Sequence, residues 1–172
     1  RHLLIEMATD ISFALDNFAR EATRARAETD LREAEEQFRG LVEQSIAGIF
    51  IIEDGKTIYV NPRAAEIVGQ GTTDELIGGD PLRWVIEAER GKVAESMRRL
   101  REGEAQSITM EFAIQRQDGL VIQVGANGAR AMRKGRPAII GMVQDISEKK
   151  RATDQIQRYV KELQEAFIST VG

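Results

Sequence analysis

The residues that break helices are confined to the middle of this sequence. All three prolines and fourteen of the fifteen glycines lie between Gly40 and Gly141. Both residue types disfavour a helix interior, glycine through its backbone entropy and proline through its missing N–H. Two stretches that contain neither, residues 1–39 and 142–171, are therefore expected to form long helices that flank one compact domain.

We expect three parts: a linker helix over residues 1–40, a compact domain over residues 41–146 and a C-terminal helix over residues 147–172. In both helices, apolar residues recur at alternating steps of four and three, which is typical of a coiled-coil seam. The seam residues are Leu4, Ala8, Ile11, Leu15, Phe18 and Ala22 in the first helix and Ile156, Val160, Leu163 and Phe167 in the second. Such a seam can pack on the helix's own domain or on a second copy of the chain. For residues 4–22 we favour a parallel homodimer.

The expected domain begins with two apolar, β-rich runs, residues 46–52 and 57–60, which flank Asp54-Gly55. Asp-Gly between such runs predicts a tight hairpin, because glycine adopts positive φ without steric cost. Asn61-Pro62 follows directly and predicts the start of a helix. The asparagine side chain can accept an N–H at the N-cap, and proline suits the first helical turn.

Three further strands are expected in the second half of the domain, over residues 108–115, 120–132 and 138–144. The first alternates apolar and polar residues, as half-buried strands do, and the last is apolar on both faces, which favours a central position. Gly125 and Gly128 in the middle strand predict bulges or kinks. Ahead of these strands, Val93, Met97 and Leu100 are spaced for one buried face of a helix. This order of elements predicts an α+β domain.

The sequence carries no pattern typical of a catalytic or metal site. It has no cysteine, and its only histidine, His2, lies outside the expected domain. Thiolate nucleophiles, cysteine zinc sites and a histidine-based triad are thereby excluded from the domain. Acidic and basic residues are interspersed at a net charge of −4, which leaves no basic surface for nucleic acid. No apolar run approaches the ~20 residues of a spanning helix, so we expect no membrane insertion. The absence of cysteine fits a cytoplasmic setting, and the absence of a catalytic pattern predicts a non-enzymatic fragment.

Two stretches at the ends of the expected domain resemble a known family. Residues 48–69, GIFIIEDGKTIYVNPRAAEIVG, are similar to the opening of a PAS domain, a sensor module of signalling proteins. Residues 141–150, GMVQDISEKK, are similar to its last strand and its Asp-Ile-Thr exit motif, with Ser147 in place of threonine. The resemblance covers about residues 38–151. It implies a PAS fold, in which short helices cover one face of a five-stranded antiparallel sheet, here flanked by long coiled-coil helices.

The resemblance also narrows the choice of cofactor. PAS relatives that bind flavin covalently use a cysteine, and haem-binding relatives use a histidine of the domain, whereas this domain has neither. No cofactor is therefore predicted, and an unknown small ligand remains compatible with an apolar cavity between sheet and helices. The candidate lining residues are Ile49, Met110, Phe112, Ile122, Val124 and Met142. The alternative, that these side chains simply fill the core, is equally supported.

The exit motif indicates a route for a signal. Asp145 ends a strand and precedes a helix, so its carboxylate can accept the N–H of Ser147 or Glu148, and Glu148 can reach back as in a capping box. A rigid link of this kind would pass a change in the sheet to the coiled coil. The predicted relay residues are Asp145, Ile146, Ser147 and Glu148. The resemblance implies a sensory relay module, and the alternative is a dimerisation spacer that binds no ligand.

The flanking helices carry two shorter resemblances. Residues 3–21, LLIEMATDISFALDNFARE, are similar to the closing helix of a GAF domain, another sensor module. Residues 163–172, LQEAFISTVG, are similar to the lead-in helix of HD-GYP phosphodiesterases, which hydrolyse cyclic dinucleotides. They imply that the chain is part of a bacterial multidomain signalling protein with an upstream sensor domain and a downstream effector. A histidine kinase or a diguanylate cyclase is the alternative effector.

Overall fold

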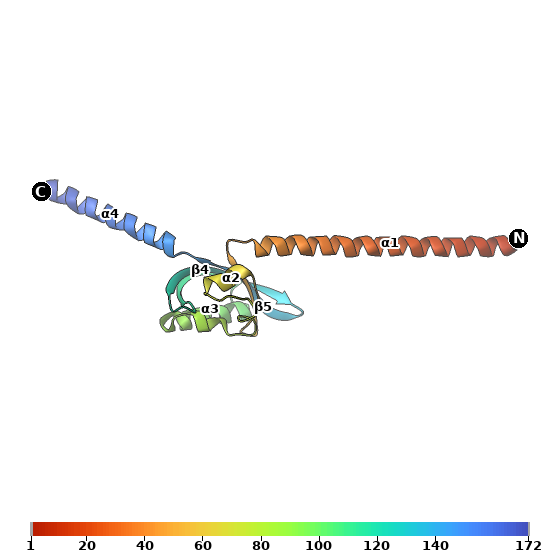
Figure 1. Cartoon of the computed structure of the whole chain (residues 1–172), viewed down its shortest axis with the longest axis horizontal. Coiled ribbons are helices and arrows are strands. Elements are labelled where there is room, and N and C mark those ends of the chain that lie inside the picture. Colours follow the sequence, from red (N-terminus) through yellow and green to blue (C-terminus); the bar gives the residue numbers. More distant parts are fainter. Residues whose placement is uncertain (1, 172) are drawn as a thin grey trace. The chain divides into compact units, whose positions relative to one another are not determined.

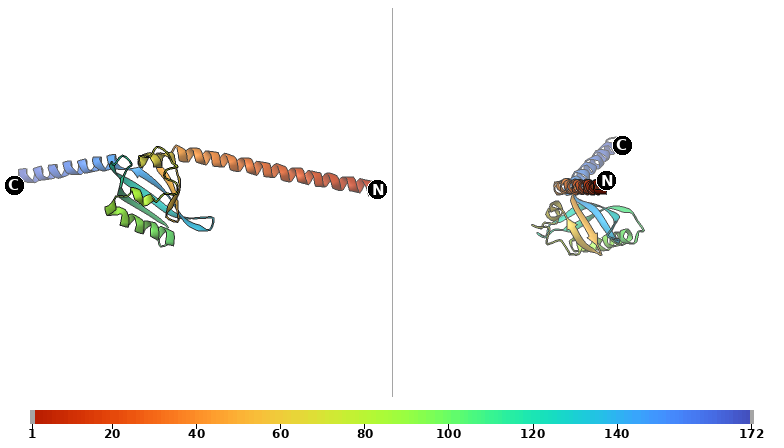
Figure 2. Two further views of the ribbon diagram at one scale, coloured as in Figure 1. Left: turned by 60° about the horizontal axis from the view of Figure 1, so that its bottom comes forward. Right: turned by 90° about the vertical axis from the view of Figure 1, so that its right-hand side faces the viewer.

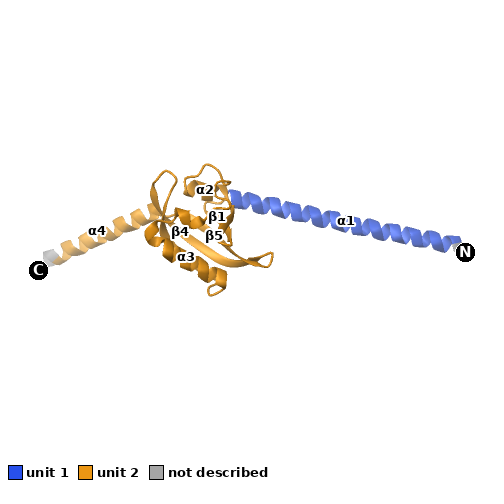
Figure 3. Cartoon of the chain, turned by 90° about the horizontal axis from the view of Figure 1, so that it is seen from below, with its two compact units in different colours: residues 1–44 blue, residues 45–172 orange. Residues whose placement is uncertain are grey.

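The structure is a computed structural model that describes residues 2–171, with side chains for residues 3–168. It divides into two compact units, residues 1–44 and residues 45–172 (Figure 3). The first unit is a single helix, α1 (His2–Glu43), which continues through Gly40. The predicted helix ends at residues 1 and 172 lie outside the described residues. No helix of the described chain combines the length and apolarity needed to cross a bilayer.

The second unit contains a five-stranded antiparallel sheet with strand order β2-β1-β5-β4-β3, which confirms the predicted α+β fold (Figure 1). The strands are β1 (Gly48–Glu53), β2 (Lys56–Val60), β3 (Ser107–Gln115), β4 (Val121–Arg133) and β5 (Arg136–Asp145). The helices are α2 (Pro62–Ile67), the 3₁₀ helix η1 (Pro81–Trp84), α3 (Glu87–Glu102) and α4 (Ser147–Val171). Residues of α2, η1 and α3 pack against one face of the sheet, as the views in Figure 2 show for α3. β5 occupies the predicted central position.

The hairpin between β1 and β2 contains an irregularity that the sequence pattern does not reveal. Asp54 and Gly55 both have positive φ, 51° and 75°, as the predicted tight turn requires. Next to the turn, Ile52 pairs with Thr57, whereas Ile51 pairs with Tyr59. Ile58 is therefore an extra residue, which makes a β-bulge. Because side chains alternate between the faces of a strand, the bulge changes which residues of β2 face the core.

The predicted irregularities at Gly125 and Gly128 are absent, because β4 keeps an unbroken register with both neighbouring strands there. The two glycines instead leave room for side chains that lie against the strand. A Cβ at Gly128 would lie 3.2 Å from Leu100 Cδ1, and one at Gly125 would lie 3.4 Å from Ile146 Cγ2. In this strand glycine therefore marks close packing rather than a bulge.

Asn61 joins β1, β2 and α2 through a fully buried side chain, 0% exposed. Its Oδ1 accepts the N–H of Ile49 at 2.8 Å and the N–H of Ala64 at 3.0 Å, while Nδ2 donates to the carbonyl of Ala47 at 3.0 Å. The bond from Ala64 confirms the predicted N-cap of α2. One amide group thus bonds to backbone groups on both sides of β2, and the N–H of Ala64 also donates to the Asn61 carbonyl at 3.1 Å.

Replacing Asn61 with alanine should destabilise the domain strongly. The change leaves buried N–H and C=O groups without partners, and such groups cost about 1–3 kcal/mol each, so we expect a loss of roughly 3 kcal/mol in the free energy of unfolding. Urea titration followed by circular dichroism measures this loss. Asn127→Ala is the matched control, because the Asn127 side chain is exposed and donates one hydrogen bond, to Thr109. Equal losses in the two variants would contradict the assigned role of Asn61.

Candidate functional site

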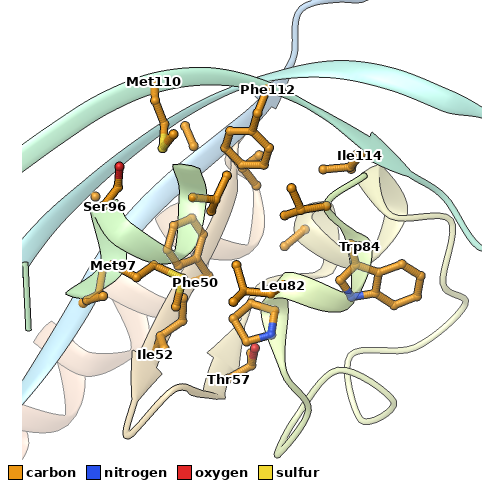
Figure 4. Close-up of a pocket in the computed structure, with 18 of the residues that line it drawn as sticks. Phe50, Ile52, Thr57, Leu82, Trp84, Ser96, Met97, Met110, Phe112 and Ile114 are labelled. Carbon is orange, nitrogen blue, oxygen red and sulfur yellow. The ribbon is translucent and has the colours of Figure 1, made fainter. Parts of the chain in front are cut away.

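A cavity of about 160 Å³ lies between the sheet and the helices α2, η1 and α3 (Figure 4). Its walls come from every strand, from the three helices and from the loop before η1. The larger lining side chains are Phe50, Ile52, Leu76, Leu82, Trp84, Met97, Met110, Phe112 and Ile114. A partly open, mainly apolar pocket of this kind is a common form of small-molecule site.

Two hydroxyl groups interrupt the apolar lining of the cavity, those of Thr57 and Ser96. Ser96 Oγ donates to the carbonyl of Lys92 at 3.1 Å. Thr57 is 5% exposed, and among the described residues its hydroxyl makes no hydrogen bond. In the part of the chain that the structure describes, no charged side chain lines the cavity. The site therefore favours neutral, largely apolar molecules.

The structure places the six predicted lining residues in three different environments. Met110 and Phe112 line the cavity, as Figure 4 shows. Ile122 and Val124 belong to the hydrophobic core cluster beside it but do not line it. Ile49 and Met142 do not line it either, and their prediction as lining residues is wrong. They pair directly with each other across β1 and β5, and Met142 is 51% exposed.

The error at β1 and β5 has a physical cause: both strands carry apolar residues on both faces, so periodicity cannot tell which face is inside. In β1 the residues that face the cavity are Phe50 and Ile52, one step out of phase with Ile49. Phe50 lies opposite Gly141 of β5, where a Cβ would be 2.5 Å from Phe50 Cζ. The missing side chain at Gly141 thus makes room for the ring, but this signal becomes readable only once the strand register is known.

The junction between sheet and exit helix is held by backbone and side-chain hydrogen bonds. Asp145 Oδ1 accepts the N–H of Ser147 at 2.9 Å, which is one of the two predicted partners. The predicted return bond from Glu148 is absent among the described residues. Instead, Ser147 Oγ accepts the N–H of Gln123 at 3.1 Å, and the N–H of Ile146 donates to the carbonyl of Gln123 at 2.9 Å. The start of α4 is therefore bonded to β4 as well as continuous with β5.

A third strand also contacts the exit helix. Lys150 Nζ of α4 lies 3.0 Å from Glu111 Oε2 of β3. Glu111 sits between Met110 and Phe112, two residues whose side chains line the cavity on the other face of the strand. Both charged side chains are about half exposed, so the ion pair contributes little stability. Glu111 and Lys150 are distant in sequence, and no local pattern predicts their pairing.

Cavity and junction lie close together along the strands. Val143 of β5 lines the cavity two residues before Asp145, and Ala126 of β4 lines it three residues after Gln123. At about 3.3 Å per strand residue, these separations are roughly 7 and 10 Å. A change in packing around the cavity thus has a short covalent path to the helix start.

The groups with shifted pKa values lie outside this site. Arg98 on α3 contacts the carboxylates of Glu95, Glu102 and Glu104, and it does not line the cavity. Hydrogen bonds from Arg98 lower the pKa of both Glu95 and Glu104, and those bonds raise the pKa of Arg98 itself. No cluster of three metal-ligating residues occurs among the described side chains.

The chain was compared with known proteins. The family model described as "PAS fold" matches residues 36–146. A solved PAS domain of an HTR-like protein from Haloarcula marismortui is 22% identical, with a TM-score of 0.60, and the match covers 70% of this chain and 98% of that one. A domain of a sensory box sensor histidine kinase/response regulator from Geobacter sulfurreducens is 24% identical, with a TM-score of 0.56, covering 67% and 96%. A sensory box histidine kinase/response regulator from Burkholderia thailandensis is 19% identical, with a TM-score of 0.56, covering 75% and 98%. No curated protein sequence matched.

Proposed function

The chain belongs to the PAS family of sensory signalling domains, and we propose that it relays a conformational change from its core to a downstream effector. In this proposal a small molecule in the cavity changes the packing of the sheet. The junction formed by Asp145, Ile146, Ser147 and Glu148 passes that change to α4. The fragment has no catalytic role of its own. The sensory kinases among the matched structures support a signalling role.

The observation that carries this proposal is the attachment of the first turn of α4 to three strands. β5 is continuous with it, the hydrogen bonds of Gln123 join it to β4, and Glu111 joins it to β3. A helix attached in this way follows a tilt or shear of the sheet instead of swivelling on one peptide bond. A coiled coil then offers discrete arrangements between which such a motion can select.

We further propose a homodimer through the flanking helices. In the single chain the seam residues are exposed, for example Leu4 at 72% and Leu15 at 63% in α1, and Leu163 at 70% and Phe167 at 72% in α4. Apolar stripes this open favour a second helix as partner. A dimerisation spacer that binds no ligand would use the same seams, and the relay test below separates the two functions.

The proposed parent protein is a bacterial, cytoplasmic signalling protein. Residues 1–40 would link an upstream sensor domain, residues 41–146 would form the PAS domain, and residues 147–172 would lead to the effector. The resemblance of residues 163–172 favours an HD-GYP phosphodiesterase and thus cyclic dinucleotide signalling. A histidine kinase or a diguanylate cyclase is the alternative.

Asp145→Ala should uncouple the relay while leaving the domain folded. The lost hydrogen bond to Ser147 costs about 1 kcal/mol, which a domain of this size tolerates. In the full-length protein we expect effector activity that no longer responds to the input. Asp118→Ala is the matched control, because Asp118 Oδ1 likewise accepts the N–H two residues ahead, that of Leu120, but in the β3–β4 turn. Normal regulation in the Asp145 variant would argue for the spacer function.

Residues 1–172 should sediment at micromolar concentration with twice the chain mass of 19.2 kDa. Truncating a buried seam leucine costs roughly 2–5 kcal/mol, so Leu15→Ala combined with Leu163→Ala should raise the dimer dissociation constant by more than about tenfold. Asp16→Ala combined with Glu162→Ala, at adjacent positions off the seam, should leave it unchanged. A monomer of the unaltered chain would rule out the proposed dimer.

A further inference from the structure

We propose that the cavity takes a neutral molecule of about the size of benzene that carries one hydrogen-bonding group, and that the Thr57 hydroxyl selects this molecule. The inference rests on the proposed sensory role of the cavity and adds the chemical class of its ligand. The volume of the cavity, the uncharged lining and one unpaired hydroxyl group each limit that class independently.

The volume of the cavity limits the size of the ligand. The cavity measures about 160 Å³. Apolar cavities of about 150 Å³ are known to hold benzene or xenon, whereas pockets for drug-sized molecules begin near 300 Å³. A ligand of about six to eight non-hydrogen atoms therefore fits without rearrangement of the core.

The lining of the cavity limits the charge of the ligand. None of the described lining side chains is ionised, and the surrounding groups are mainly aliphatic, aromatic and thioether. Burying an ion without a partner is far more costly than burying a neutral molecule. Carboxylates, phosphates and ammonium groups are therefore excluded, and neutral molecules are favoured.

The bulge in β2 places the one unpaired hydroxyl group in this lining. With strict alternation from Val60, which lines the cavity, Ile58 would face inward and Thr57 outward. The extra residue at Ile58 reverses this order, so that Thr57 lies opposite Ile52 and lines the cavity, whereas Ile58 does not. Bulges often re-aim a side chain beside a functional site. Here a hydroxyl replaces the apolar side chain that a regular strand would supply.

The hydroxyl of Thr57 is available to a ligand, because it makes no hydrogen bond within the described chain. The backbone of Thr57 is fixed, because its N–H donates to the carbonyl of Gly79 at 3.0 Å and its carbonyl accepts the N–H of Gly78 at 2.7 Å. The residue is 5% exposed, its side-chain oxygen is not fully buried, and that oxygen makes no hydrogen bond among the described residues. Figure 4 shows it at the edge of the cavity. Because Thr57 lines the cavity and its oxygen is not fully buried, a hydroxyl on a bound molecule can pair with it.

Phenol, benzene and benzoate test the inference as probes on the unaltered chain at pH 7, with isothermal titration calorimetry as the measurement. Burial alone favours benzene, because phenol must give up hydrogen bonds to water. We therefore expect phenol to bind at least about fivefold more tightly than benzene if its hydroxyl pairs with Thr57, and benzoate not to bind. Equal or weaker binding of phenol, or binding of benzoate, would overturn the proposal, as would the absence of binding by both neutral probes.

Thr57→Val tests the residue itself, since valine keeps the β-branched shape and removes the hydroxyl. We expect phenol to bind about tenfold more weakly and benzene to bind with unchanged affinity. Thr57→Ser should retain the preference for phenol, and Thr153→Val, at an exposed site on α4, should bind as the unaltered chain does.

Unchanged phenol affinity in a folded Thr57→Val variant would overturn the role of Thr57. If that variant does not fold, the probe selectivity of the unaltered chain decides. Selective binding without any effect on effector output would contradict the relay and leave this inference standing.

Discussion

The packing of α2 against β1 depends on the buried amide of Asn61. Its oxygen accepts N–H groups from β1 and α2, and its nitrogen donates to the chain ahead of β1. The same contact brings α2 so close to β1 that a Cβ at Gly48 would lie 2.8 Å from Ala64 Cα. Ala64 and Val60, the residue before Asn61, both line the cavity. The hydrogen bonds of one side chain therefore hold one wall of the candidate site in place.

The cavity and the exit helix α4 are connected through the same three strands of the sheet. Each of β3, β4 and β5 lines the cavity and also reaches the first turn of α4, through Glu111, Gln123 and Asp145 respectively. Since neighbouring strands are hydrogen-bonded along their length, a shift of one strand is shared with the next. This arrangement supports the proposal that packing around the cavity biases the orientation of α4.

Features that join residues near each other in the sequence were predicted, whereas features that depend on contacts between distant segments were missed. The Asp54-Gly55 turn, the Asn61 cap and the bond from Ser147 to Asp145 each join residues near in sequence, and each was predicted. Where both faces of a strand are apolar, the periodicity of the sequence does not show which face is inside. Ile49 and Met142 were therefore wrongly predicted to line the cavity, and Phe50 was not predicted. The bulge at Ile58 and the bond between Gln123 and Ser147 depend on pairing between distant segments. No periodicity within one segment encodes such a pairing, which is why the unpaired Thr57 hydroxyl emerged only from the structure.

The central claim, that a change at the cavity reaches the exit helix, can be tested most directly by NMR of residues 1–172 under xenon pressure. Xenon enters apolar cavities of this size without needing a polar partner. The account predicts backbone amide shifts at lining residues such as Met110 and Val143, and equally at Gln123 and Ser147, with Lys134 in the turn at the other end of β4 and β5 unaffected. Shifts confined to the lining residues, with Gln123 and Ser147 unchanged, would contradict it.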